Sequence, residues 1–117
     1  MSENIRRYAV PTANGEMCLH FGHCDQFALI DVDVENCKIV DIQMKTPPPH
    51  EPGVLPRWLH EEGAHVILSG GMGERAQNLF TENSIEMVTG VSVGKPEDIV
   101  LAYVKGELVT GSNVCDH

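Results

Sequence analysis

The sequence predicts a single α/β domain, and three observations support that prediction. Short apolar runs typical of strands come first along the chain, and strand-like and helix-like segments alternate in the second half. An apolar fraction of 42% is enough to build a core without disulfides. The length of 117 residues fits one domain, with no room for a separate catalytic partner domain.

Five segments have the composition of β-strands. They are Ile5–Thr12, Phe27–Val34, Cys37–Met44, His65–Ser69 and Ile85–Thr89. The second and third are separated only by Glu35-Asn36, so they predict a β-hairpin. Residues 13–25, which open with Ala13-Asn14-Gly15, are expected to form a loop rather than an element.

Three segments change to helical spacing. Their apolar stripes are Leu55, Trp58 and Leu59, then Ala76, Leu79 and Phe80, then Ile99, Val100, Tyr103 and Val104. Gly63 suits the end of the first helix and Pro96 the first turn of the third. Strands joined through helices are parallel, so the expected fold is a five-stranded mixed sheet with helices on both faces. Residues 1–108 form the single domain in this prediction, and 109–117 a flexible C-terminal tail.

The charge excludes several classes of partner. The formal net charge is −9 and Lys and Arg total only eight, so the field repels phosphate backbones and anionic membrane surfaces. An equally good explanation of the acidity is plain solubility. No apolar run approaches the length of a spanning helix and no secretory leader opens the chain, so we expect a cytoplasmic protein that binds neither nucleic acid nor membrane.

The stretch Cys18-Leu19-His20-Phe21-Gly22-His23-Cys24 is the most informative part of the sequence. Thiolates and imidazoles together favour Zn, Cu or iron–sulfur centres over Mg or Ca. His20, His23 and Cys24 are therefore candidate metal ligands, and the alternative is a polar turn with one buried thiol. Cys115 and His117 offer a similar pair in a tail that could close over bound metal, unless the tail is simply disordered.

The other Cys and His residues are interpreted individually. The cysteine spacing is not that of a zinc finger. Cys37 falls in a strand-like run and is expected to behave as a small hydrophobe, whereas the role of Cys18 stays open. His50 is a plausible additional ligand in a loop of its own. His60 and His65 are interpreted as surface or edge histidines.

The glycine-rich turn Gly70-Gly71-Met72-Gly73 lies between a predicted strand and a predicted helix. It formally matches a dinucleotide fingerprint, but the next strand ends without the acidic residue that a ribose needs and the chain is short for that fold. Free N–H groups at a helix start can instead bind an anion, such as a sulfide-bridged cluster or a thiometallate. The alternative is a tight turn that requires small residues.

Enzymatic hypotheses find less support. Two-metal hydrolysis needs carboxylates on a central strand, and Ile5–Val10 contains none. A Cys24–His20 nucleophile pair is conceivable for a small hydrolase, but no orienting group or oxyanion turn accompanies it. We therefore expect a protein that is not an enzyme.

Several motifs together resemble the dinitrogenase iron–molybdenum cofactor biosynthesis family, which includes NifX-type carriers and the orange protein. These motifs are Ala9–Thr12, His20–Cys24 with Phe27, Ser69–Gly73, Asn83–Gly90 and Tyr103–Leu108, so the resemblance extends from about Arg7 to Leu108. Cys24 and the ending Asn113–His117 resemble a stand-alone subgroup and are not general to the family.

The resemblance implies a three-layer α/β/α sandwich with a ribonuclease H-like motif, and a protein that binds or transfers metalloclusters without turnover. It also implies that the loop with His20 and Gly22 faces the glycine turn across one cluster-binding cavity. The implied cargo is an iron–molybdenum or other metal–sulfur cluster, of Fe/Mo/S or Mo/Cu/S type, or its precursor. The implied partners are cluster donor and acceptor proteins, with the chain a monomer or weak homodimer. A zinc-binding regulatory or interaction module remains the alternative.

Overall fold

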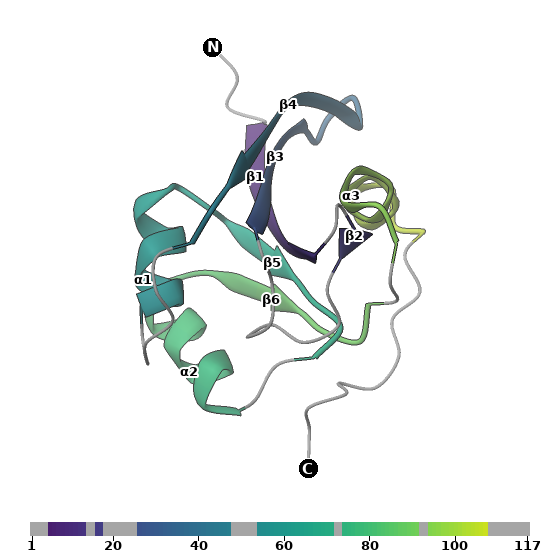
Figure 1. Ribbon diagram of the computed structural model, residues 1–117. Helices are drawn as coiled ribbons and strands as arrows, with labels where there is room; N and C mark the ends of the chain where they lie inside the picture. Colours follow the sequence, from purple (N-terminus) through teal and green to yellow (C-terminus); the bar gives the residue numbers. More distant parts are fainter. Residues whose placement is uncertain are drawn as a thin grey trace.

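The computed structural model describes residues 5–13, 16–17, 26–47, 54–71, 74–91 and 94–107. Strands and helices follow one another in the predicted order, with one short strand in addition (Figure 1). The elements are β1 (Ile5–Ala13), β2 (Glu16–Met17), β3 (Gln26–Asp33), β4 (Lys38–Lys45), α1 (Val54–Glu61), β5 (Val66–Leu68), α2 (Glu74–Glu82), β6 (Glu86–Val88) and α3 (Pro96–Val104).

The main sheet has the strand order β4-β3-β1-β5-β6, and β2 pairs with the end of β1. β3 is antiparallel to both β1 and β4, whereas β1, β5 and β6 are mutually parallel. The parallel pairs are the ones joined through helices, as connections of this kind require. The prediction of a five-stranded mixed sheet with three helices is confirmed.

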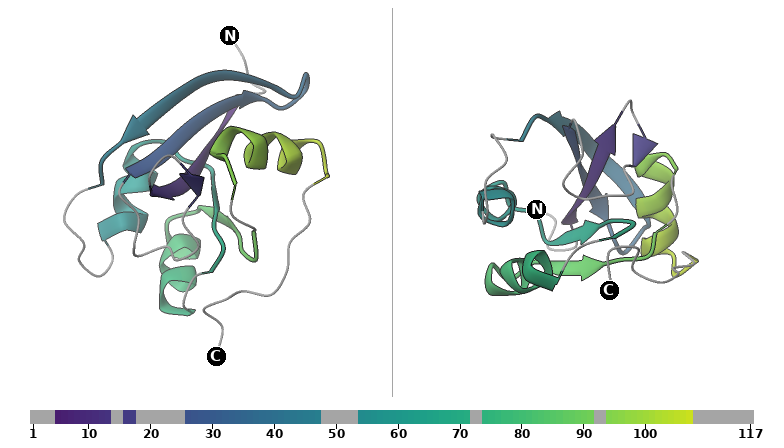
Figure 2. Two further views of the ribbon diagram at one scale, coloured as in Figure 1. Left: turned by 45° about the vertical axis from the view of Figure 1, so that its right-hand side comes forward. Right: turned by 60° about the horizontal axis from the view of Figure 1, so that its bottom comes forward.

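The helices cover both faces of the sheet, so the molecule has three layers (Figure 2). One core cluster joins Ala9 and Ile67 of the sheet to Leu59 of α1 and Phe80 of α2. A second cluster, on the other face, includes Val100 of α3. The alternation of side chains along each strand supplies both faces of the sheet with apolar residues. No helix in the described ranges is long and apolar enough to cross a membrane.

Two sequence predictions require correction. Residues 13–25 are not entirely a loop, because Glu16 and Met17 pair with Ala13 and Thr12. The pairing leaves only Asn14-Gly15 between the strands, which is a strong signal for a hairpin. Cys37 is not within a strand: β4 begins at Lys38, and Cys37 ends the β3–β4 turn with φ of 53°. Cys37 is therefore a half-buried turn residue with positive φ and not a core residue.

Each helix ends in the same hydrogen-bonded motif. After α1, the N–H of Gly63 donates to His60 O, and the next N–H reaches back to Leu59 O. Both bonds together form a Schellman motif, which requires a left-handed residue. Gly63 and Gly106 fill that position after α1 and α3, with φ of 81° and 76°. The predicted stop at Gly63 is thus confirmed. After α2 the same position is held by Ser84, with φ of 61°.

We expect Ser84→Gly to stabilise the protein by about 1 kcal/mol, because a side chain in the left-handed region is strained and glycine is not. Chemical denaturation monitored by circular dichroism measures the change. Gly106→Ala is the matched control, since nothing lies within 4 Å of a Cβ added there. It should destabilise by a similar amount through backbone conformation alone. Equal or lower stability of the Ser84→Gly variant would contradict this account.

Arg7, near the start of β1, joins three elements. Its Nε and Nη2 donate to the two carboxylate oxygens of Asp31 on β3, at 2.7 and 3.0 Å. Its Nη1 donates to the carbonyl of Glu62, just after α1, at 2.6 Å. The backbone N–H of Arg7 donates to Nδ1 of His65 at 2.9 Å. Burial, with the nearby guanidinium groups, lowers the pKa of His65, which favours this neutral acceptor.

Arg7→Lys should lower the free energy of unfolding by about 1–3 kcal/mol, because an ammonium cannot make the paired bonds to Asp31 and also reach the end of α1. Urea denaturation gives the value. Arg6→Lys is the control, a neighbouring conservative change that should leave stability within about 0.5 kcal/mol. If both variants match the parent protein, the Arg7 contacts contribute nothing to stability.

Candidate functional site

Four strands of the sheet end at one edge, which we call the carboxyl edge. β1, β5 and β6 are parallel, and β4 runs the same way because β3 is antiparallel to both β1 and β4. β3 begins at this edge. The chain therefore leaves or enters the sheet here at residues 14–25, 46–53, 69–73 and 89–95. In α/β sheets, ligands bind at the carboxyl ends of the parallel strands.

The sheet divides at the carboxyl edge. β1 pairs with β5 at Tyr8 and Ala9, whereas its pairing with β3 continues to Thr12. The buried Thr12 also donates through Oγ1 to the carbonyl of Gln26, at 2.9 Å. Backbone pairing and this hydroxyl fix the two ends of the segment that contains residues 18–25. The described residues on either side of that segment are therefore fixed to the sheet.

Ser69 organises the first part of the glycine turn. It is fully buried, and its Oγ donates to the carbonyl of Gly71 at 2.9 Å. The same oxygen accepts from the N–H of Gly71 at 3.3 Å. Since the hydroxyl satisfies both polar groups of a buried glycine, it holds the backbone of this turn in one conformation.

A second turn, Thr89–Val91, lies beside the first. The N–H of Gly90 donates to Gly70 O at 3.1 Å, and that of Val91 donates to Ser69 O at 3.2 Å. Gly90 has φ of 77°, a conformation that favours glycine. Sequence reasoning did not include this turn in the site. The available signal was the repeated order of strand, hydroxyl residue and glycine, as Ser69-Gly70 after β5 and Thr89-Gly90 after β6.

The hydrogen bonds limit which backbone groups could bind an anion. The N–H of Ser69 donates to Val88 O, and the N–H of Gly71 is used by Ser69 Oγ. Glu74 adds a carboxylate in the first turn of α2, where it opposes a second negative charge. Two of the N–H groups in this turn are therefore already engaged within the protein, and Met72 and Gly73 are outside the described residues.

The predicted site residues are only partly within the described ranges. Gly70 and Gly71 are buried at the carboxyl edge. The other predicted site residues, and the unassigned Cys18 and His50, fall outside the described part: His20, Gly22, His23, Cys24, Met72, Gly73, Cys115 and His117. Among the residues that are described, no group of three or more His, Cys, Asp or Glu could hold a metal ion.

The described Cys and His residues lie away from the carboxyl edge. Cys37 follows β3 and His65 precedes β5, so both are at the opposite edge of the sheet. His60 is exposed in the last turn of α1. The interpretation of His60 and His65 as surface or edge residues agrees with their exposure.

The sequence matches the model of the family described as "Dinitrogenase iron-molybdenum cofactor" over residues 4–106. The chain belongs to this family. The match covers nearly all of the described fold and both turns at the carboxyl edge. No curated protein matches this family member significantly.

Solved structures resemble this family member over most of their length. The protein PH0822 is 30% identical, with a TM-score of 0.80, and the alignment covers 89% of this chain and 93% of that one. The apo orange protein of Desulfovibrio gigas is 19% identical (TM-score 0.72, covering 92% and 94%). The protein mj0327 of Methanocaldococcus jannaschii is 18% identical (TM-score 0.71, covering 94% and 97%). The last two similarities concern the fold.

Ser69→Ala should lower the free energy of unfolding by about 1–3 kcal/mol, because it leaves the buried N–H and C=O of Gly71 without their partner. Thermal and urea denaturation measure the loss. Thr81→Ala is the matched control: it removes an exposed hydroxyl that bonds the carbonyl of Gln77 within α2. Its stability should stay the same or rise slightly, since alanine favours helix. Equal effects of the two changes would show that Ser69 does not hold the turn.

Proposed function

We propose that this protein binds a metal–sulfur cluster, or a precursor of one, at the carboxyl edge and carries it between proteins without turnover. The single observation that supports this most is topological. β1 and β3 lead into the segment with His20, His23 and Cys24, and β1 is next to β5, which with β6 leads into the two glycine turns. The cluster is cargo in this proposal, of Fe/Mo/S or Mo/Cu/S type. Its donor and acceptor would be other proteins of cofactor assembly.

The donor chemistry supports such a cargo. Thiolate and imidazole ligands suit soft metals and sulfide-bridged centres. Thr12 and the β1–β3 pairing anchor the start and the end of the ligand segment, while Ser69 and Gly90 shape the neighbouring turns. A rigid base with ligands on the connecting segments is the arrangement that loops on α/β scaffolds provide.

The tail can reach this edge. α3 begins at the carboxyl edge and ends at the opposite one, where the Tyr103 hydroxyl donates to Oε2 of Glu86 at the start of β6. The nine residues of α3 span about 13 Å. From Glu107 to Cys115 the chain can extend over about 27 Å. Cys115 and His117 can therefore return along α3 to the carboxyl edge, and we propose them as ligands that close over the cargo.

Anaerobic incubation with ferrous iron, sulfide and molybdate should give visible charge-transfer bands that remain after desalting. The double variant His20→Ala/Cys24→Ala should lose most of this absorbance, because it lacks a thiolate and an imidazole of the proposed set. Cys37→Ala is the control: it also removes one thiol, but from a turn at the opposite edge. Its spectrum should match that of the parent protein.

Elemental analysis of the same samples separates the alternatives. A structural zinc module would contain one Zn per chain and no inorganic sulfide, and its melting temperature would fall with chelator. Bands that survive in the double variant would refute the ligand assignment. Truncation after Asn113 isolates the tail: if Cys115 and His117 close over the cargo, the truncated protein should release it faster to a chelator.

A further inference from the structure

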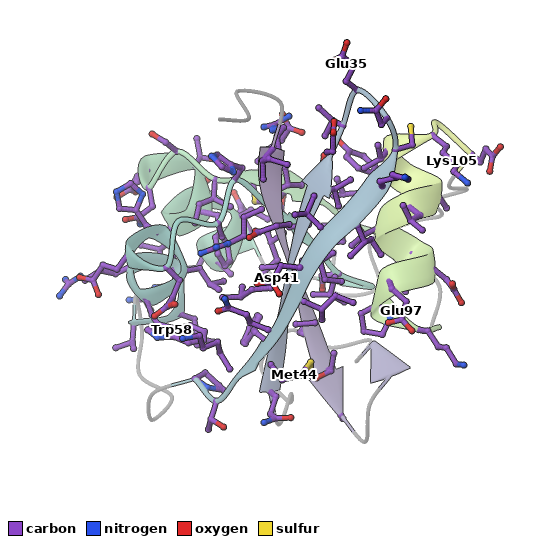
Figure 3. All side chains as sticks on the ribbon, turned by 90° about the horizontal axis from the view of Figure 1, so that it is seen from above. Glu35, Asp41, Met44, Trp58, Glu97 and Lys105 are labelled. Carbon is purple, nitrogen blue, oxygen red and sulfur yellow. The ribbon has the colours of Figure 1, made fainter. Side chains whose placement is uncertain are left out.

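The free edge of β4 has an apolar surface that the core does not explain. Val40, Ile42 and Met44 are 59%, 44% and 44% exposed, and every large exposed hydrophobic residue among those described lies on this strand. Among the described strands β4 is the outermost, with β3 as its only neighbour in the sheet order (Figure 1). Figure 3 labels Asp41 and Met44 on this strand. The outer edge of such a strand presents backbone N–H and C=O groups to another strand.

Charged and apolar side chains of β4 lie on different faces of the sheet. Ile42 and Met44 are opposite Ile30 and Ala28, which belong to the core cluster under α3. Their side chains thus share the α3 face. Asp41 and Lys45 occupy the alternate positions, so their side chains lie on the other face. The stretch from 41 to 45 therefore has an apolar side and a side with one negative and one positive charge.

We infer that β4 pairs with β4 of a second copy of this chain, antiparallel and centred on Gln43. In that register Ile42 of each copy lies opposite Met44 of the other, which gives two apolar pairs on the α3 face. Asp41 of each copy lies opposite Lys45 of the other, which brings opposite charges together twice on the other face, where Lys45 Nζ is also 3.7 Å from Oε1 of Glu62 in its own copy. Cross-strand pairs of both kinds stabilise antiparallel sheets.

Neighbouring registers are less favourable. Pairing centred on Ile42 places Lys45 opposite Ile39 and Asp41 opposite Gln43. Pairing centred between residues 41 and 42 places Lys38 opposite Lys45, two like charges. The pairing of β4 with β3 also shifts register between Asp41 and Ile39, so a bulge at Val40 interrupts the strand just before the self-complementary stretch. Only the register centred on Gln43 uses the regular part of β4 and matches its charges, which favours a second copy as the occupant.

The pairing would be weak and would leave the proposed cargo site open. The bulge and Lys38 limit the overlap to the stretch from 41 to 45, so the dimer should depend on concentration and on salt. Two antiparallel β4 strands turn the carboxyl edges of the two copies in opposite directions. The dimer would then be one continuous sheet with a separate binding site at each end.

Sedimentation equilibrium from about 1 µM to about 1 mM, a range in which weak interfaces dissociate, should show the mass rise from 12.8 kDa toward twice that value. Ile42→Lys should weaken association by tenfold or more. Asn78→Lys, which adds the same charge at an exposed position of α2, should leave association unchanged. Circular dichroism melts of both variants verify folding.

A charge exchange tests the register itself. Asp41→Lys and Lys45→Asp each place like charges opposite one another and should each weaken the dimer about tenfold. The double variant Asp41→Lys/Lys45→Asp should restore association, because the pairs reform with their signs exchanged. Lys45→Asp also replaces the Lys45–Glu62 ion pair of each copy by two carboxylates, so circular dichroism melts of the single and double variants verify folding. A parent protein that stays at 12.8 kDa throughout, or a double variant no better than the single ones, would overturn the inference. Metal bound per chain should be the same for Ile42→Lys and the parent, so this test is independent of the proposed cargo.

Discussion

The double pairing of β1 is the constraint on which the rest of the structure depends. β1 is antiparallel to β3 from Ile5 to Thr12 and parallel to β5 at Tyr8 and Ala9. The antiparallel side builds a meander with β4, and the parallel side requires a crossover through α1. Because β1 lies in the middle, its buried residues contribute to the core clusters on both faces. Each of the three helices contributes residues to one of these two clusters.

The two ends of β1 make different contacts. At its start, Arg7 ties together β3 and the end of α1 through its guanidinium group. These hydrogen bonds are all made to residues of the same chain, so Arg7 stabilises the fold. At its end, Thr12 fixes the chain where the candidate ligand segment begins and returns. Arg7 thus joins elements at one edge of the sheet, and Thr12 fixes the chain at the other.

The carboxyl edge combines hydrogen-bonded turns with connecting segments that contain the candidate ligands. Ser69 bonds Gly71, and the N–H groups of Gly90 and Val91 donate to the carbonyls of the first turn, so the turns do not need a ligand to hold their shape. The candidate thiols and imidazoles come from segments between or beyond these elements.

Local patterns in the sequence were enough to predict most elements. Alternating apolar residues predicted β3 and helical spacing predicted α1 with its stop at Gly63, because periodicity and left-handed caps depend on near neighbours. The two-residue strand β2 was missed, since an element of that length has no periodicity. Cys37 was assigned to the strand for a related reason: the local sequence does not distinguish the last residue of a turn from the first residue of the next strand.

The sequence by itself determined the order and type of every element except β2, and the residue types available for metal chemistry. Only the tertiary structure decided which segments meet. It placed Thr89–Val91 beside Ser69–Gly71, and it put β4 at the edge, where Ile42 and Met44 are exposed although their spacing resembles that of a buried strand. The physical reason is that burial and adjacency depend on strand pairing between residues far apart in the chain, which a local pattern does not specify.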